Sequence, residues 1–157
     1  MTTAIPAGFH SVTPMLVLKD ARKAVEFYKR AFGADELFVM PGPDGKGVMH
    51  AELRIGNSII MLGEENPKES CKSAETMGGS PVSLYVYVEN AEEAFRTARA
   101  AGAEAQMPVE DMFWGDRAGT VQDPFGYKWT LATHIKDLTA QELQESANAF
   151  FAKMTRK

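Results

Sequence analysis

The most chemically capable pair of residues is His50 and Glu52, which lie two positions apart in the alternating segment 48–55. Side chains two apart on a strand leave the same face, so the carboxylate can orient and charge the imidazole. Such a pair can act as a general acid and base, or supply two ligands to a metal. With Arg54 it can equally form a structural polar ladder, or contact a bound ligand. His134, at the end of another predicted strand, is expected to be an ordinary surface histidine.

A second candidate group lies in the segment 112–117, MFWGDR. Trp114 beside flexible Gly115 can close over a planar ligand, while Asp116 and Arg117 can hydrogen-bond to it or bind an anionic group. The alternative is a structural corner in which the tryptophan fills a gap and the aspartate pairs with the arginine.

A unit that the chain repeats at an offset of 70 residues must position these groups. The segment MLVLKDA at 15–21 matches YVYVENA at 85–91, each an apolar strand, a helix N-cap residue and an alanine. Gly33 matches Gly102 after one dropped residue, and Gly56 matches Gly126. Two copies of one strand–helix–strands unit imply two half-sheets facing each other across a cleft. Such a cleft commonly holds a small ligand.

The periodicity predicts one α+β domain over residues 1–157, made of two tandem βαβββ modules that form a curved mixed sheet around a cleft. Helices are expected after Asp20 and Asn90, each ending at a glycine. The predicted strands of the first module span 12–18, 36–40, 48–55 and 58–62. The first strand of the second module is predicted at 82–88. The parts are module 1 at about 8–63, a connector at 64–81, module 2 at about 82–134 and a C-terminal helix at about 139–155.

Composition argues for a cytoplasmic protein that binds neither nucleic acid nor membrane. The net charge is −4 and neither sign is clustered, which disfavours polyanionic partners. No apolar run approaches the length of a membrane span, and no signal peptide is evident. The single cysteine, Cys71, has no partner for an internal disulfide.

Several strings carry a family resemblance: VTPMLVLKDARKAVEFYKRAFGA, HAELRIGNSIIML, GGSPVSLYVYVENAEEAF, WGDRAGTVQDPFGYKW and LATH. Together they resemble the vicinal oxygen chelate superfamily, which contains glyoxalase I, bleomycin-resistance proteins, fosfomycin-resistance enzymes and extradiol dioxygenases. Within it they are most similar to the PhnB-like branch. The resemblance implies paired βαβββ modules and a ligand-binding cleft between them.

The resemblance also implies where a divalent metal would bind. Four side chains would hold it, one from the first strand and one from the last strand of each module. Those places fall on Thr13, on Ile60 or Met61, on Ser83 and on Thr130. Neutral hydroxyls are poor ligands and isoleucine has no donor atom, whereas such metals prefer His, Glu or Gln there. We therefore expect no cofactor, although a divalent metal held elsewhere by His50 and Glu52 remains an alternative.

Strand alternation predicts which side chains face the cleft, because the helix-packing face should be the apolar one. In segment 48–55, Met49, Ala51, Leu53 and Ile55 are assigned to the helix side, so His50 and Glu52 point to the cleft. The expected ligand-binding residues are Thr13, Met15, Arg54, Met61, Ser83, Tyr85, Tyr87, Trp114, Asp116, Arg117, Gln122 and Thr130.

The C-terminal helix carries an apolar stripe that includes Phe150 and Phe151, which must cover either the protein's own sheet or a second subunit. We expect a homodimer. For function we expect a protein that binds a small planar or aromatic molecule in the cleft. The alternatives are a lyase, isomerase or transferase that uses His50 and Glu52 or a non-standard metal site, and a dimerising scaffold. No glycine-rich strand-to-helix loop suggests a methyl-donor site.

Overall fold

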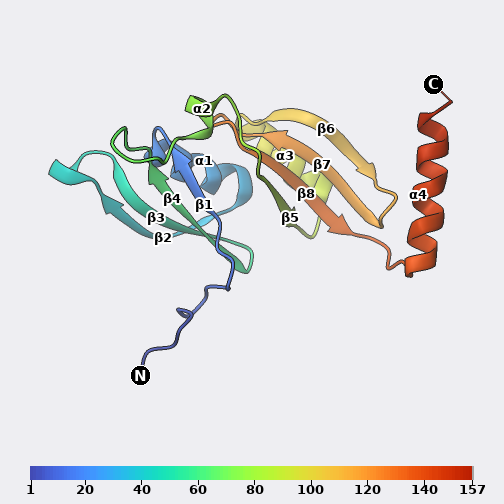
Figure 1. Cartoon of the computed structure of the whole chain (residues 1–157), viewed down its shortest axis with the longest axis horizontal. Coiled ribbons are helices and arrows are strands. Elements are labelled where there is room, and N and C mark those ends of the chain that lie inside the picture. The colour runs from blue at the N-terminus through green and yellow to red at the C-terminus, as the bar shows by residue number, and fades with distance from the viewer. Residues whose placement is uncertain (157) are drawn as a thin grey trace.

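The computed structural model describes residues 1–156, which form two copies of one arrangement followed by a helix (Figure 1). The first copy comprises β1 (Met15–Leu18), α1 (Ala21–Phe32), β2 (Asp35–Pro41), a 3-10 turn (Pro43–Gly45), β3 (Val48–Ile55) and β4 (Ser58–Glu64). The second comprises β5 (Ser83–Tyr87), α3 (Ala91–Ala101), β6 (Glu104–Asp111), β7 (Asp116–Gln122) and β8 (Lys128–His134). The connector carries α2 (Ala74–Met77), and α4 (Ala140–Met154) follows β8.

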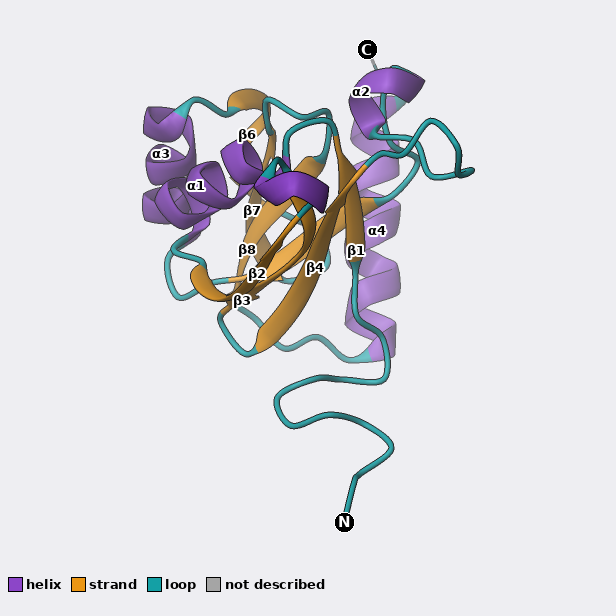
Figure 2. Ribbon diagram, turned by 90° about the vertical axis from the view of Figure 1, so that its left-hand side faces the viewer, coloured by secondary structure: helices purple, strands orange, loops and turns teal. Residues whose placement is uncertain are grey.

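The two copies have the same topology. Their strand orders are β1-β4-β3-β2 and β5-β8-β7-β6, with the first and last strands of each copy parallel and the other neighbours antiparallel. The prediction of an α+β fold with two βαβββ modules is confirmed, and the expected curved surface consists of two four-stranded sheets. In Figure 2, α1 and α3 lie together on one side of the strands, and α4 lies on the other.

The helix ends follow from local chemistry. The Asp20 side chain accepts a hydrogen bond from the backbone N–H of Lys23, and Asn90 does the same for Glu93, which satisfies a free N–H at each helix start. Gly33 and Gly102 end the helices with φ of 63° and 118°, a conformation that glycine adopts without strain. The predicted caps and ends are therefore confirmed.

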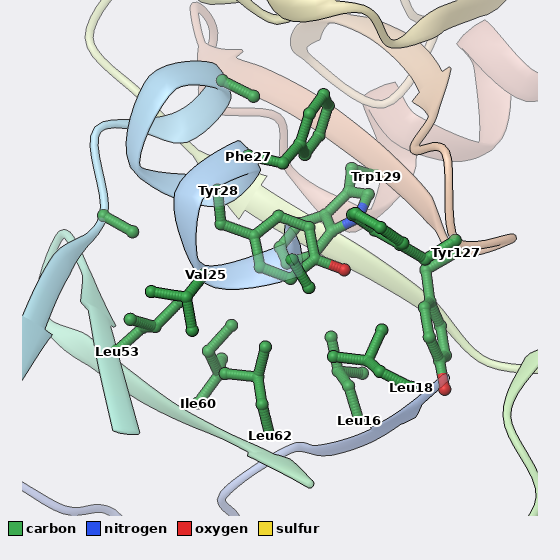
Figure 3. Packing of buried hydrophobic residues seen from close by; sticks show 14 of the residues in the cluster. Leu16, Leu18, Val25, Phe27, Tyr28, Leu53, Ile60, Leu62, Tyr127 and Trp129 are labelled. Atoms are coloured by element: carbon green, nitrogen blue, oxygen red, sulfur yellow. The ribbon is translucent and has the colours of Figure 1, made fainter. Parts of the chain in front are cut away.

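Both modules contribute to one core, which Figure 3 shows from close by. The Tyr28 ring on α1 packs against Phe125 and Trp129 of the second module, with centroid distances of 5.9 and 5.1 Å. Trp129 is 1% exposed. The α1 face that enters this core is apolar, which explains why the helix forms against the sheet.

A buried carboxylate, Asp123, joins the modules inside that core. Its Oδ2 accepts hydrogen bonds from the Tyr28 hydroxyl at 2.6 Å and the Trp129 indole N–H at 2.9 Å. Its Oδ1 accepts from the backbone N–H groups of Phe125 and Tyr127, both at 2.9 Å. Burial raises the pKa of the Asp123 carboxyl, and these four hydrogen bonds oppose that shift. The DPFG segment at 123–126 therefore ties the second module to α1.

Two details differ from the sequence prediction. β1 begins at Met15 rather than at residue 12. Met49 was assigned to the helix side but is 56% exposed, while Val48 is buried. The pairing of β2 with β3 shifts here, from Met40 opposite His50 to Pro41 opposite Val48, so the extra residue forms a bulge. A bulge reverses the alternation locally, which sequence parity cannot anticipate.

Candidate functional site

Each sheet has one face covered by a helix and one open face. Strand register places matching rows of side chains across the open faces, because directly opposed residues share a face. The row on the first sheet is Met15, Met61, Glu52 and Phe38. The row on the second sheet is Tyr85, Thr130, Thr120 and Met107. Each of these side chains is exposed or half-buried, so both rows are accessible to a ligand.

The densest group of polar side chains gathers around Asp116 on the second open face. The Asp116 Oδ2 accepts hydrogen bonds from the hydroxyls of Tyr85 at 2.7 Å and Tyr87 at 3.1 Å, and from the Trp114 indole N–H at 3.2 Å. Its Oδ1 lies 2.8 Å from His134 Nδ1. We call Tyr85, Tyr87, Trp114, Asp116 and His134 the Asp116 cluster. Asp116 is only 2% exposed, whereas the three aromatic side chains are 40–64% exposed.

The electrostatics of the cluster follow from this geometry. Burial alone would raise the pKa of the Asp116 carboxyl, but the hydrogen bonds from His134, the tyrosines and Trp114 lower it overall. The hydrogen bond to Asp116, followed by one to Asp137 at 2.9 Å, raises the pKa of His134. Burial is the larger cause that raises the pKa of Tyr85 to about 12, and the hydrogen bond to Asp116 adds to this shift.

The raised His134 pKa is testable by NMR. We expect the His134 ring to titrate above the usual value of about 6.5, and its pKa to fall in Asp116→Asn. Because the folded-state pKa is raised, the stability that this pair contributes is fully present below the unfolded pKa and is lost as pH rises through the folded value. The free energy of unfolding should therefore fall more steeply with pH in the wild type than in His134→Gln. A His134 pKa that Asp116→Asn leaves unchanged would contradict the assignment.

His134 is the member of the cluster that the sequence analysis missed, since it was predicted to be an ordinary surface residue. It lies directly opposite Asp116 in the β7–β8 register. The signal was available in strand parity, because residues 128, 130, 132 and 134 alternate onto one face. The structure does not bring Arg117 into the cluster. Arg117 instead pairs with Asp111 at 2.6 Å. Thr133, which lies opposite Arg117 on β8, accepts a hydrogen bond from the first N–H of α3, so this pair of residues faces the helix side.

The predicted catalytic pair lies on the first open face. His50 Nε2 is 3.1 Å from Glu52 Oε1, and both side chains are about one-quarter exposed. The Phe38 ring lies beside the imidazole, with centroids 6.5 Å apart. Arg54 does not complete a ladder with them, because it pairs with Asp35 at 2.9 Å. The structure therefore leaves a two-residue pair with ligand access.

Two hollows adjoin the open faces. One, of about 530 Å³, lies between the modules and is lined by His10, Val12, the β3–β4 hairpin and residues 84–87, so Tyr85 and Tyr87 connect it to the Asp116 cluster. The other, of about 420 Å³, lies between the N-terminal segment and Thr13, Glu52 and Met61. Both volumes fall in the range of small-molecule sites.

The places that the family resemblance assigns to a metal do not fit one. The Thr13 hydroxyl donates to the His10 carbonyl, and the Thr130 hydroxyl is paired with Thr120 at 2.8 Å. Ile60 is buried in the core. Across residues 1–156, no three His, Cys, Asp or Glu side chains group closely enough to hold a metal ion. Ser83 and Gln122 lie at the far end of the second sheet, each opposite Lys128 of β8.

Comparison with known proteins places this fold in one class. The chain belongs to the Glyoxalase/Bleomycin resistance protein/Dioxygenase superfamily, whose model matches residues 8–131. The predicted superfamily resemblance is therefore confirmed. Within the described residues, no helix has the length and apolar character needed to cross a membrane.

The chain is also similar to individual proteins. Uncharacterized protein Rv0887c of Mycobacterium tuberculosis is 38% identical over 142 residues, which cover 88% of this chain and 83% of that protein. TioX from Micromonospora sp. ML1 has a TM-score of 0.63 at 27% identity, covering 83% of this chain and 100% of that one. A gene product from Arabidopsis thaliana has a TM-score of 0.65 at 30% identity, covering 79% and 98%. A putative 3-demethylubiquinone-9 3-methyltransferase, PhnB protein, from Bacillus cereus shares the fold at 20% identity and a TM-score of 0.61, covering 79% and 99%.

Proposed function

We propose that this protein, a relative of the PhnB-like branch, binds a small planar or aromatic molecule between the open faces of its sheets without the metal typical of the superfamily. The observation that carries the proposal is the Asp116 cluster. Three partly exposed aromatic side chains converge on one buried carboxylate, which fixes their orientation before a ligand arrives. Pre-oriented rings lose little entropy on binding, and they offer faces for stacking.

The cleft is completed, in this proposal, by a second copy of the chain. The open faces carry exposed apolar side chains such as Met15, Phe38 and Tyr87, and α4 presents a further apolar stripe. Exposed apolar side chains in this number are typical of an interface. A homodimer would enclose the ligand more fully than one chain does.

Intrinsic fluorescence tests the binding proposal. The two tryptophans differ in exposure, with Trp114 at 40% and Trp129 at 1%, so a ligand that stacks on the Asp116 cluster should quench Trp114 more strongly than Trp129, which lines the hollow between the modules. We expect a panel of neutral and charged aromatic compounds to include ligands that quench Trp114 emission. Trp114→Ala should weaken their binding about tenfold, the effect of truncating one aromatic contact worth about 1.4 kcal/mol.

Two controls make the outcome decisive. Trp114→Phe keeps a ring, so it should lose the quenching while binding measured by calorimetry persists. Treatment with a chelator should change neither result, because no metal is required. Binding that disappears with the chelator, or a panel without any ligand, would reject the proposal.

A second candidate function is acid–base catalysis by His50 and Glu52. Their hydrogen bond of 3.1 Å on an accessible face favours it, because a carboxylate so placed orients the imidazole for proton transfer. Turnover of a bound ligand that is lost in His50→Gln would establish this function. Stoichiometric binding without turnover would favour the first.

A further inference from the structure

The three aromatic residues of the Asp116 cluster point their polar protons inward. Each tyrosine hydroxyl has one proton and two acceptor lone pairs, and both Tyr85 and Tyr87 direct that proton to Asp116. The single indole proton of Trp114 is shared between Asp116 and the Tyr85 oxygen, at 3.2 Å each. The side that faces the cleft therefore offers acceptor lone pairs and ring faces.

Of the cationic groups near the cluster, His134 and Arg117 are engaged, Lys128 is distant, and Lys136 lies on the adjoining loop, where its backbone N–H donates to the Gly115 carbonyl at 3.0 Å. Both ring nitrogens of His134 contact carboxylates, those of Asp116 and Asp137. The Arg117 guanidinium makes two hydrogen bonds to Asp111 on the helix side, at 2.6 and 3.2 Å. Lys128 begins β8, at the opposite end from His134. Against the rings, an anionic ligand would meet the acceptor side of the tyrosine hydroxyls rather than a hydrogen-bond donor.

The ring faces favour the opposite sign. Protonated His134 and the neighbouring Lys136 can balance the charges of Asp116 and Asp137, so the preference for a cation comes from the rings and the tyrosine lone pairs. The Tyr85, Tyr87 and Trp114 rings stand around Asp116 with 45%, 64% and 40% of their surface exposed, and the tyrosine centroids are 5.4 Å apart. The negative faces of aromatic rings attract cations, and this attraction strengthens where water is excluded.

We propose that the Asp116 cluster receives a positively charged nitrogen of the ligand, a quaternary ammonium or an N-alkylated aromatic ring, against the faces of Tyr85, Tyr87 and Trp114. This inference rests on the proposed binding function and names its ligand class. The buried Asp116 supplies the charge behind the rings, and the tyrosine lone pairs add negative potential on the side that faces the cation.

Three probes of similar size separate charge from shape. Phenyltrimethylammonium and tert-butylbenzene differ in one atom and one charge, and benzoate reverses the sign. Their binding can be followed by the NMR shift of the Trp114 indole N–H. We expect phenyltrimethylammonium to bind about tenfold more tightly than tert-butylbenzene, as cation–aromatic contacts with partial burial produce, and benzoate to bind most weakly.

Variants locate the effect in the cluster. Asp116→Asn should remove most of the preference for the cation, whereas Asp111→Asn, on the same hairpin but paired with Arg117 on the helix side, should leave it intact. Tyr87→Leu removes an exposed ring face without removing the carboxylate, so it should weaken cation binding about threefold or more. Tyr87→Phe keeps the ring but loses the hydrogen bond to Asp116, so it should bind the cation more tightly than Tyr87→Leu and less tightly than wild type. This pair tests the inference even if Asp116→Asn fails to fold.

The outcomes distinguish the inference from the function on which it rests. Equal binding of phenyltrimethylammonium and tert-butylbenzene, or tighter binding of benzoate, would overturn the cation inference and leave aromatic binding standing. Failure of all three probes, together with failure of the wider aromatic panel, would overturn both. A cation preference unaffected by Asp116→Asn and by Tyr87→Leu would also overturn the inference, because the cation would then bind elsewhere.

Discussion

Asp123→Ala is expected to lower the free energy of unfolding by about 4 kcal/mol or more. The substitution leaves four buried donors without an acceptor, namely the Tyr28 hydroxyl, the Trp129 indole N–H and the backbone N–H groups of Phe125 and Tyr127. A buried donor without a partner costs at least about 1 kcal/mol. Since domains are stable by about 5–15 kcal/mol, the variant should lose a large share of its stability. Urea denaturation followed by circular dichroism measures the change.

Asp111→Ala is the matched control, because Asp111 is also an aspartate with hydrogen bonds at 2.6 and 3.2 Å but lies exposed on the surface. Exposed ion pairs contribute about 1 kcal/mol or less. Tyr28→Phe removes a single donor and leaves Asp123 with three, so its effect should fall between the two. If Asp123→Ala unfolds within about 1 kcal/mol of wild type, the carboxylate does not hold the modules together.

The fold was predictable because its determinants are local and occur twice. The caps at Asp20 and Asn90, the left-handed glycines at 33 and 102 and the apolar helix faces are all readable from residue type and spacing. The role of Asp123 was not readable, since it depends on Tyr28, which lies 95 residues away in the sequence. The exposure of Met49 depends on a bulge whose cause lies in the pairing with β2.

The candidate site was predictable in part. Strand alternation predicted that Tyr85 and Tyr87 lie on the open face, and in the structure both hydroxyls donate a hydrogen bond to Asp116. Asp116 and Arg117 were assigned together from a short motif, yet consecutive residues on a strand face opposite sides, so only the aspartate reaches the cluster. The pairing of His134 with Asp116 depends on the β7–β8 register. The turn between the two strands fixes that register, and strand alternation alone does not reveal it.

The second large effect concerns assembly through α4. None of its residues is buried in the described chain, and Phe150 and Phe151 are 45% and 55% exposed. Their contact with the rest of the chain includes Phe113, at centroid distances of 5.1 and 6.1 Å. Full burial of an aromatic side chain contributes about 1.5–3 kcal/mol, so covering the exposed half of four such rings in a dimer contributes about 3–6 kcal/mol.

We therefore expect wild-type protein to sediment as a dimer at micromolar concentrations, and the double variant Phe150→Ser, Phe151→Ser to dissociate with a Kd higher by about two to four powers of ten. Gln144→Ala is the matched control on the same helix, since Gln144 makes only an exposed hydrogen bond to Asn148 and should leave the dimer intact. Retained helicity in the double variant would show that assembly, rather than folding, was lost. A monomeric wild type would mean that the α4 stripe does not serve a second copy, and that each chain binds its ligand with the open faces it presents alone.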